Sequence, residues 1–123
     1  MSEQHTITRS PLWMWICGLS STALFLTLVA MAVHIRLALG RWPGFGEGCH
    51  TALFRIHEFI FGGVGLFAVF VAGPIWLIFL CFRSFRVSRR IHAFQALAFI
   101  GGWLLIYLAG KYDPTPFTYW FLD

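Results

Sequence analysis

Charged side chains are scarce in this sequence. Of 123 residues, 9 are Lys or Arg and 5 are Asp or Glu, so 11% are charged, against about 25% in a typical water-soluble domain. Another 59% are apolar, and the 14 Phe and 6 Trp residues are more than the core of so small a domain could bury. The mean hydropathy is +0.74. We therefore expect lipid, rather than water, to surround most of the chain.

Motifs that mark an active site or a redox centre are also missing. The chain has no CxxC, CxxCH, P-loop, GxGxxG, HExxH or GxSxG pattern and no internal repeat. Its 3 cysteines, Cys17, Cys49 and Cys81, are placed too far apart for an intrachain disulfide. Although the net charge is +4, the cations are few and are not spread over a polar surface, so a nucleic-acid-binding protein is excluded.

Three long apolar runs dominate what is present. A helix needs roughly 20 apolar residues to cross the hydrocarbon of a bilayer. Backbone groups in lipid must be satisfied within the segment, which favours helices, and the sequence lacks the alternating strands of a barrel. We predict an all-α fold, in which residues 1–123 form a single integral membrane domain with transmembrane helices over about residues 11–39, 59–82 and 91–110.

The segment between the second and third runs, residues 83–90, is rich in arginine and has no acidic residue. By the positive-inside rule this loop is cytoplasmic, so the N-terminus is inside, while the loop 40–58 and the tail 111–123 are outside. We expect the cytoplasmic (inner) membrane of a bacterium to be the location. The same arginines are candidate ligands for anionic lipid head groups: Arg83, Arg86, Arg89 and Arg90.

A cleaved signal peptide is an alternative interpretation of the first run. Ala30, Met31 and Ala32 resemble a cleavage site, which would remove residues 1–32. The apolar stretch is longer than a typical signal peptide needs, and Arg9 is the lone cation before it. We favour a retained helix, and the mass of the mature protein distinguishes the two.

Small side chains recur at helical spacing in each run, where they would let helix backbones approach closely. These predicted contact faces comprise Ser20, Ala23, Thr27 and Ala30 in the first run, Gly62, Gly65, Ala68 and Ala72 in the second, and Ala98, Gly101, Gly102 and Ala109 in the third. The opposite faces are expected to meet lipid or a partner subunit, and they contain Phe67, Phe70, Phe79, Phe99 and Leu104. Pro74 should kink or loosen the second helix. The hydroxyls of Ser20, Ser21 and Thr22 are expected to bond to carbonyls of their own helix.

Groups capable of metal chemistry gather on the outer side. We expect the first helix to end at Gly40 and a short interfacial helix to begin near Glu47 and run into the second span. On that helix Glu47, His50, His57 and Glu58 share one side, and His34 faces them from the first helix. These residues are candidate ligands for zinc or a non-haem metal, with His34 and His57 as candidates for haem: His34, Glu47, His50, His57 and Glu58.

Polar residues on an interfacial helix more commonly meet water and head groups, and two turns separate His50 from His57. We therefore expect no cofactor. His92 lies near the arginine loop and should cap the third helix. The tail 111–123, interrupted by Pro114 and Pro116, is expected either to lie flat on the outer leaflet or to dock on a larger subunit.

These observations lead to one main functional hypothesis. The chain is a small multi-pass membrane protein without its own catalysis, an accessory or assembly subunit whose partner is a larger membrane protein or a second copy. The alternative is a metal- or haem-binding redox module built on the outer His and Glu residues. A pore-forming, holin-like role suits the size, but the spans lack a polar face.

Overall fold

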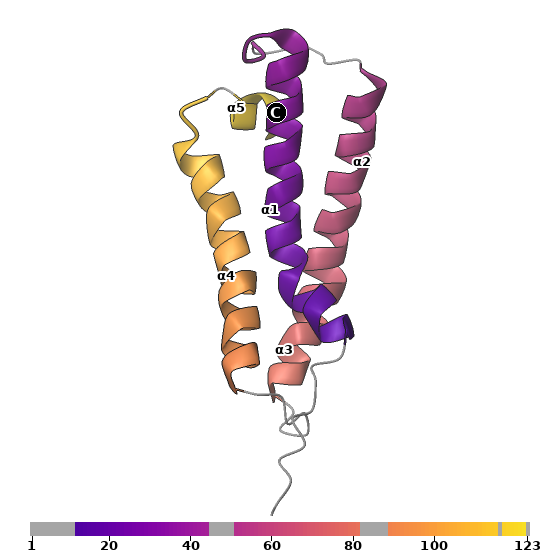
Figure 1. The fold of residues 1–123 in the computed structure, drawn as a ribbon, viewed down its shortest axis with the longest axis vertical. Helices are drawn as coiled ribbons and strands as arrows, with labels where there is room; N and C mark the ends of the chain where they lie inside the picture. Colours follow the sequence, from indigo (N-terminus) through magenta and orange to yellow (C-terminus); the bar gives the residue numbers. More distant parts are fainter. Residues whose placement is uncertain (1–11, 45–50, 82–88, 116, 123) are drawn as a thin grey trace, which may run out of the picture.

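A computed structural model describes residues 12–44, 51–81, 89–115 and 117–122. Within these ranges the chain is an all-α bundle, as predicted (Figure 1). The elements in chain order are α1 (Leu12–Leu39), α2 (Ala52–Phe67), the π-helical turn η1 (Ala68–Ala72), α3 (Gly73–Cys81), α4 (Arg89–Tyr112) and α5 (Phe117–Leu122).

Three helical segments in the described ranges are long and apolar enough to cross a membrane: Leu12–Leu39, Ala52–Ile78 and Arg89–Tyr112. This confirms the three predicted spans. The second begins earlier than expected because Thr51 caps it, its hydroxyl accepting a hydrogen bond from the Phe54 N–H at 3.2 Å. The polar residues after Ala52 thus belong to the spanning helix itself. No separate interfacial helix occurs in 40–44 or at Thr51, and residues 45–50, including Glu47, lie outside the described residues.

The first helix ends at Gly40, as predicted. Gly40 has a φ of 68°, a left-handed conformation that glycine adopts without a steric penalty. The Arg36 side chain donates a hydrogen bond to the Gly40 carbonyl oxygen, and its guanidinium lies 5.8 Å from the centre of the Trp42 ring. Arg36 therefore stabilises the turn that follows the helix. We refer to this end of the bundle as the Gly40 end and to the opposite end as the Arg89 end.

The second span is loosened where Pro74 enters it, in agreement with the prediction. Proline has no N–H, and its ring collides with the carbonyl four residues earlier. The preceding turn, Ala68–Ala72, widens into a π-helix, and the Gly73 N–H bonds to the carbonyl of Ala68, five residues back. The helix then continues as α3.

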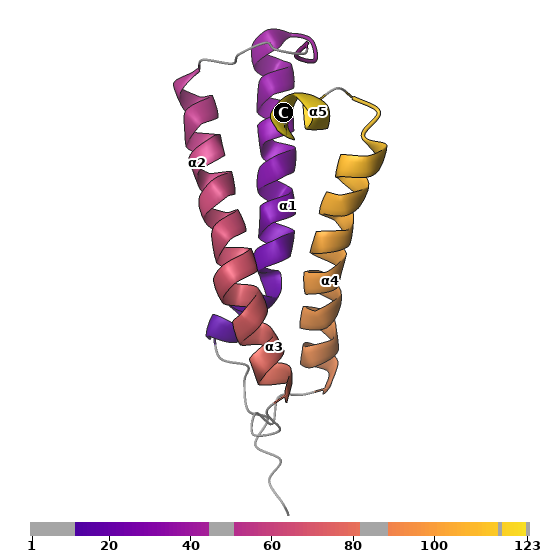
Figure 2. The ribbon, with the colours of Figure 1, turned by 180° about the vertical axis from the view of Figure 1, so that it is seen from behind.

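Helix α1 is the centre of the bundle and packs against both other spans. Helices α2 and α4 diverge toward the Gly40 end (Figures 1 and 2). At the Arg89 end α3 approaches α4, and the rings of Trp76 and Phe99 stack with centroids 5.0 Å apart. The expectation that Phe99 faces lipid or a partner is therefore wrong, because the convergence of α3 and α4 places it inside the bundle.

Helices α1 and α4 make their closest approach at Gly102. A Cβ atom on Gly102 would lie 2.5 Å from the backbone nitrogen of Thr22. The Ser21 hydroxyl donates to the Phe99 carbonyl at 2.7 Å, and the Thr22 hydroxyl donates to the Ala98 carbonyl at 2.8 Å. Of these three hydroxyls, that of Ser20 bonds within its own helix as expected, to the Cys17 carbonyl at 2.8 Å. The expectation for Ser21 and Thr22 is wrong, because the missing side chain of Gly102 brings the α4 carbonyls within their reach.

The predicted small-residue faces are partly right. Gly102, Ala68 and Ala72 are buried, but Ala23 and Ala30 of α1 are exposed. The buried face of α1 instead carries larger side chains toward the Gly40 end: Leu24, Leu28, Met31 and Ile35. Because α2 and α4 diverge there, small residues would leave the space between the helices unfilled.

The hydroxyl bonds between α1 and α4 can be tested with a Ser21→Ala, Thr22→Val double variant. Hydrogen bonds between membrane helices contribute about 0.6 kcal/mol each on average, so we expect a loss of about 1 kcal/mol in unfolding free energy. Unfolding in mixed detergent and SDS micelles, followed by tryptophan fluorescence, measures this loss. Ser20→Ala is the matched control and should change stability little, since its bond lies within one helix. Equal losses in both variants would contradict the assignment.

Candidate functional site

The Gly40 end brings two of the predicted ligand residues together. His34 lies near the end of α1 and His57 in the second turn of α2, and both are partly buried. Their ring centroids are 5.3 Å apart, and the ring planes are inclined by 42°. The Nε2 atom of His34 is 3.5 Å from the Thr51 hydroxyl oxygen. The prediction that His34 faces the start of the second helix is confirmed, since α1 and α2 run antiparallel side by side.

Among the described residues, no other predicted ligand lies beside this pair. Glu58 is exposed on α2, and Glu47 and His50 lie outside the described residues. Among the residues that the structure describes, no group of three or more His, Cys, Asp or Glu side chains is close enough to hold one ion. Of the five candidate ligands, the structure brings His34 and His57 together, and the part played by Glu47 and His50 stays a prediction.

Haem ligation by this pair does not fit the geometry. Two axial imidazoles bind opposite faces of a haem, so the macrocycle must lie between them. With centroids 5.3 Å apart, the rings of His34 and His57 are in contact with each other. A haem would require α1 and α2 to separate at this end.

Two of the four candidate lipid-binding arginines are described, and both lie at the opposite end of the bundle. Arg89 and Arg90 are exposed in the first turn of α4, whereas Arg83 and Arg86 lie outside the described residues. His92 follows in the next turn, and its Nδ1 atom is buried without a hydrogen-bond partner in the described part of the chain. The predicted capping bond from this nitrogen is therefore not formed there.

The tail after α4 forms a structure that the sequence analysis missed. The Asp113 carboxylate accepts hydrogen bonds from the backbone N–H groups of Thr115 at 2.8 Å and Thr118 at 2.9 Å. It also accepts from the hydroxyls of the same two threonines. A carboxylate with Thr at the second and fifth positions after it is the local signal for such a turn and helix start. This network turns the chain back and begins α5.

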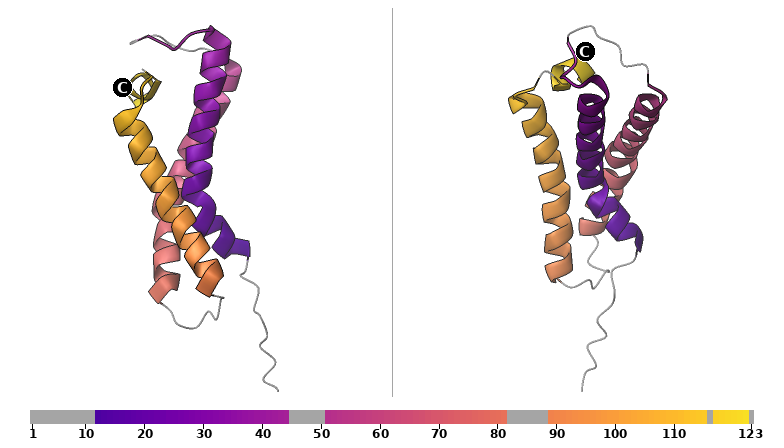
Figure 3. Two further views of the ribbon diagram at one scale, coloured as in Figure 1. Left: turned by 60° about the vertical axis from the view of Figure 1, so that its left-hand side comes forward. Right: turned by 45° about the horizontal axis from the view of Figure 1, so that its top comes forward.

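Helix α5 folds back over the Gly40 end, between the end of α4 and α1 (Figure 3). Phe117 is 4% exposed and belongs to a buried cluster with Leu28, Met31, Ile35 and Phe54. The rings of Phe54 and Trp120 lie 5.5 Å apart, and those of Phe61 and Phe121 lie 5.2 Å apart. These aromatic residues therefore pack on the bundle in the space where α2 and α4 diverge, while contact of the tail with the outer leaflet or with a larger subunit stays a prediction.

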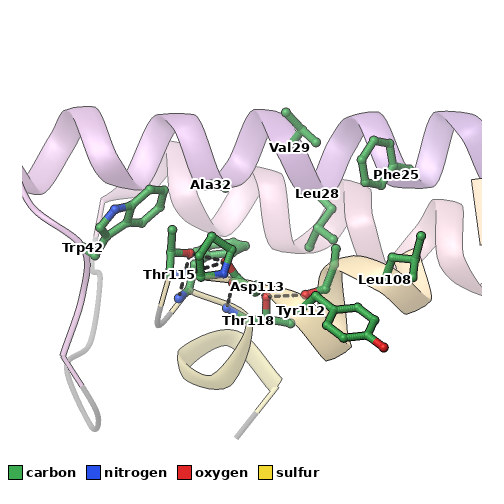
Figure 4. Close-up of a pocket in the computed structure, with 13 residues that line it drawn as sticks. Phe25, Leu28, Val29, Ala32, Trp42, Leu108, Tyr112, Asp113, Thr115 and Thr118 are labelled. Carbon is green, nitrogen blue, oxygen red and sulfur yellow. Dashed lines mark hydrogen bonds between the residues drawn. The ribbon is translucent and has the colours of Figure 1, made fainter. Parts of the chain in front are cut away.

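An apolar groove of about 290 Å³ remains beside α5, between α1 and α4 (Figure 4). Its walls include Phe25, Leu28, Leu108 and Tyr112. Its polar residues, Asp113, Thr115 and Thr118, are occupied by the hydrogen bonds that begin α5. The groove therefore offers mainly apolar contact.

The Asp113 network makes the docking of α5 sensitive to pH. Burial raises the pKa of Asp113, but the hydrogen bonds from Thr115 and Thr118 outweigh it, so the pKa lies below its usual value. Stabilisation by a carboxyl with a lowered pKa is complete above the pKa of the unfolded state and is lost as the pH falls through that of the folded state. We expect acid to release α5, with a change in fluorescence as the Trp42 and Trp120 environments change.

In Asp113→Asn the same acid transition should be absent, and α5 should dock more weakly at neutral pH. Glu58→Gln, which alters an exposed carboxyl on α2, serves as the control and should keep the transition. A transition that persists in Asp113→Asn would show that another group is responsible.

Comparison with known proteins finds no matching family model, no similar curated protein and no similar solved structure. A functional proposal therefore depends on the geometry described above.

Proposed function

We propose that this protein is a non-catalytic accessory or assembly subunit of a larger membrane complex. The main supporting observation is the small amount of span surface that the chain buries on itself. In the most apolar stretch of each span, 39% of the residues are buried in α1, but only 17% in Ala52–Ile78 and 11% in α4. Most of the surface of α2 and α4 is thus open to lipid or to another protein.

The exposed surface includes places where another helix could pack closely. A Cβ atom added at Gly62 or Gly63 of α2 would meet no atom within 4 Å. On α1, Ala23 and Ala30 are also exposed, and Ala23 lines an apolar groove of about 440 Å³ between α1 and α2. Small residues on an exposed face allow close contact between membrane helices, which supports a helical partner or a second copy.

The polar groups of the spans support a structural role. The hydroxyls of Ser20, Ser21, Thr22 and Thr27 all donate to backbone carbonyls at 2.7–2.8 Å. The bonds from Ser21 and Thr22 hold α1 against α4, and all four bonds leave the hydroxyl protons unavailable for chemistry. An ion or proton pathway generally uses ionisable side chains near the middle of the membrane, and the described spans carry none there.

We further propose that the protein lies in the cytoplasmic membrane with the Arg89 end inside and the Gly40 end outside. Arg89 and Arg90, with Arg83 and Arg86 before them, are the supporting feature. A reporter fused after Arg90 should be active in the cytoplasm, and a reporter at the C-terminus should be active outside. An exported reporter at Arg90 would overturn this orientation. The mass of the mature protein tests whether residues 1–32 are retained.

The subunit proposal is tested by mild solubilisation of native membranes and capture through a non-histidine tag at the N-terminus. We expect a co-purifying membrane protein or a defined oligomer. Gly62→Leu should reduce this association, since it fills an open position on α2 without touching the bundle. A single monomer peak without a companion protein would contradict the proposal.

A further inference from the structure

We propose that His34 and His57 form a binding site for a divalent transition-metal ion, with Cu²⁺ bound most tightly, that links α1 and α2 at the Gly40 end. This inference does not depend on the accessory-subunit proposal. The site uses one imidazole from each helix, and water completes the coordination shell.

The separation of the rings fits a shared ion. A metal–nitrogen distance of about 2.0–2.1 Å holds the centroids of two imidazoles about 4.5 Å apart at the right angle of tetragonal copper and about 5 Å apart at the tetrahedral angle of zinc. The observed centroid distance is 5.3 Å, with the planes inclined by 42°. The observed separation is therefore close to the one that two imidazoles on a shared ion adopt.

His34 can offer a nitrogen lone pair to an ion. A neutral imidazole carries one unprotonated nitrogen, which acts as a metal ligand. The Nε2 atom of His34 lies 3.5 Å from the Thr51 hydroxyl oxygen, which is a long hydrogen bond. A metal ion can take the place of this long hydrogen bond at little cost.

The described cations next to His34 and His57 in the sequence do not face the pair. Arg36 is turned away from the pair, because it bonds to the Gly40 carbonyl and lies over Trp42. Arg55 is exposed two positions before His57, which places it on the opposite side of α2. Glu58 is the next residue after His57 and adds a negative charge nearby.

The two ligands are neutral nitrogens, and the partly exposed position leaves room for water. Imidazole suits copper, nickel and zinc, and the affinity of a given nitrogen site rises toward Cu²⁺ along the divalent series. A two-histidine site has no charge of its own to offset a divalent ion, so exchange of the ion with solution should be reversible. We therefore infer an exchangeable site.

The experiment uses the full chain in detergent, purified with a non-histidine tag and stripped with chelator. Titration with Cu²⁺ should show one equivalent bound, with electron paramagnetic resonance coupling to two nitrogens. His34→Gln and His57→Gln keep a polar side chain of similar size but should each weaken Cu²⁺ binding by about tenfold or more. His5→Gln and His92→Gln are the matched controls and should retain the wild-type affinity.

A second readout separates binding from misfolding. Zn²⁺ should raise the thermal unfolding midpoint of the wild type and of both controls, because an ion that binds the folded state stabilises it. It should leave His34→Gln and His57→Gln unchanged, although these variants should keep the wild-type circular dichroism spectrum. Cu²⁺ affinity that is unaltered in either glutamine variant, or a spectrum without two-nitrogen coupling, would overturn the proposal.

Discussion

A Gly102→Ala variant is expected to lose about 1–3 kcal/mol of unfolding free energy, the usual cost of overpacking a tight contact. The added Cβ atom would lie 2.5 Å from the Thr22 backbone nitrogen and 2.6 Å from the Ser21 carbonyl carbon. Backbone atoms cannot rotate aside, so α1 and α4 would have to separate. Separation would in turn lengthen the hydroxyl bonds from Ser21 and Thr22 to the α4 carbonyls.

The neighbouring glycine provides a matched control. A Cβ atom on Gly101 would meet no atom within 4 Å, so Gly101→Ala should leave stability unchanged or raise it through better helix propensity. Both variants can be compared by unfolding in mixed micelles with SDS. If Gly101→Ala were as destabilising as Gly102→Ala, the contact between α1 and α4 would not be the one described.

A Phe117→Ala variant is expected to lose about 3 kcal/mol, the lower end of the range for truncating a buried Phe. Phe117 is 4% exposed, and its ring lies 6.1 Å from that of Trp120 and 6.0 Å from that of Phe121. We choose the lower end because a released α5 can place its apolar side chains in the membrane interface, which repays part of the loss.

Release of α5 should also be detectable by measurements other than the unfolding free energy. Proteolysis near the C-terminus should accelerate in Phe117→Ala, and the fluorescence of Trp42 and Trp120 should shift as their surroundings change. Phe59→Ala is the matched control, because Phe59 is 83% exposed on α2 and contributes little to the bundle. A Phe117→Ala variant with wild-type stability and proteolysis would mean that α5 is not held by the aromatic cluster.

Together the two variants test which surfaces of the helices the chain buries itself and which it leaves exposed. Gly102 holds α4 against α1, and Phe117 closes the space between the diverging helices at the Gly40 end. If α5 closes this end, its buried aromatic residues are unavailable to another protein. The surface left for a partner is then the exposed side of α2 and α4, which is where the accessory-subunit proposal places it.

The spans were predictable because their signal is local. Low charge over long apolar runs requires helices in lipid whatever the neighbours are, and the structure agrees on all three segments. The end of α1 at Gly40 and the widened turn before Pro74 were predictable for the same reason. Each follows from the backbone chemistry of one residue. Periodicity was less reliable for α1, where it predicted Ala23 and Ala30 as contact residues and the structure exposes both.

The candidate site was partly predictable. Helical spacing directed His34 toward the start of the second span, and the structure brings it to His57. Spacing could not establish which other ligands would come near, because that depends on how two helices are rotated against each other. The role of Asp113 was also missed, although the threonines that follow it carry the signal for a capped turn.

The sequence by itself determined that the chain is helical, that it has three apolar spans and where each of them lies, because the hydrocarbon of a membrane permits little else. The tertiary structure decided which faces meet. One absent side chain at Gly102 sets the distance between α1 and α4, and the divergence of α2 from α4 determines that α5 folds inward. Those outcomes depend on the rotation and crossing of whole helices, which the order of residues along one helix does not specify.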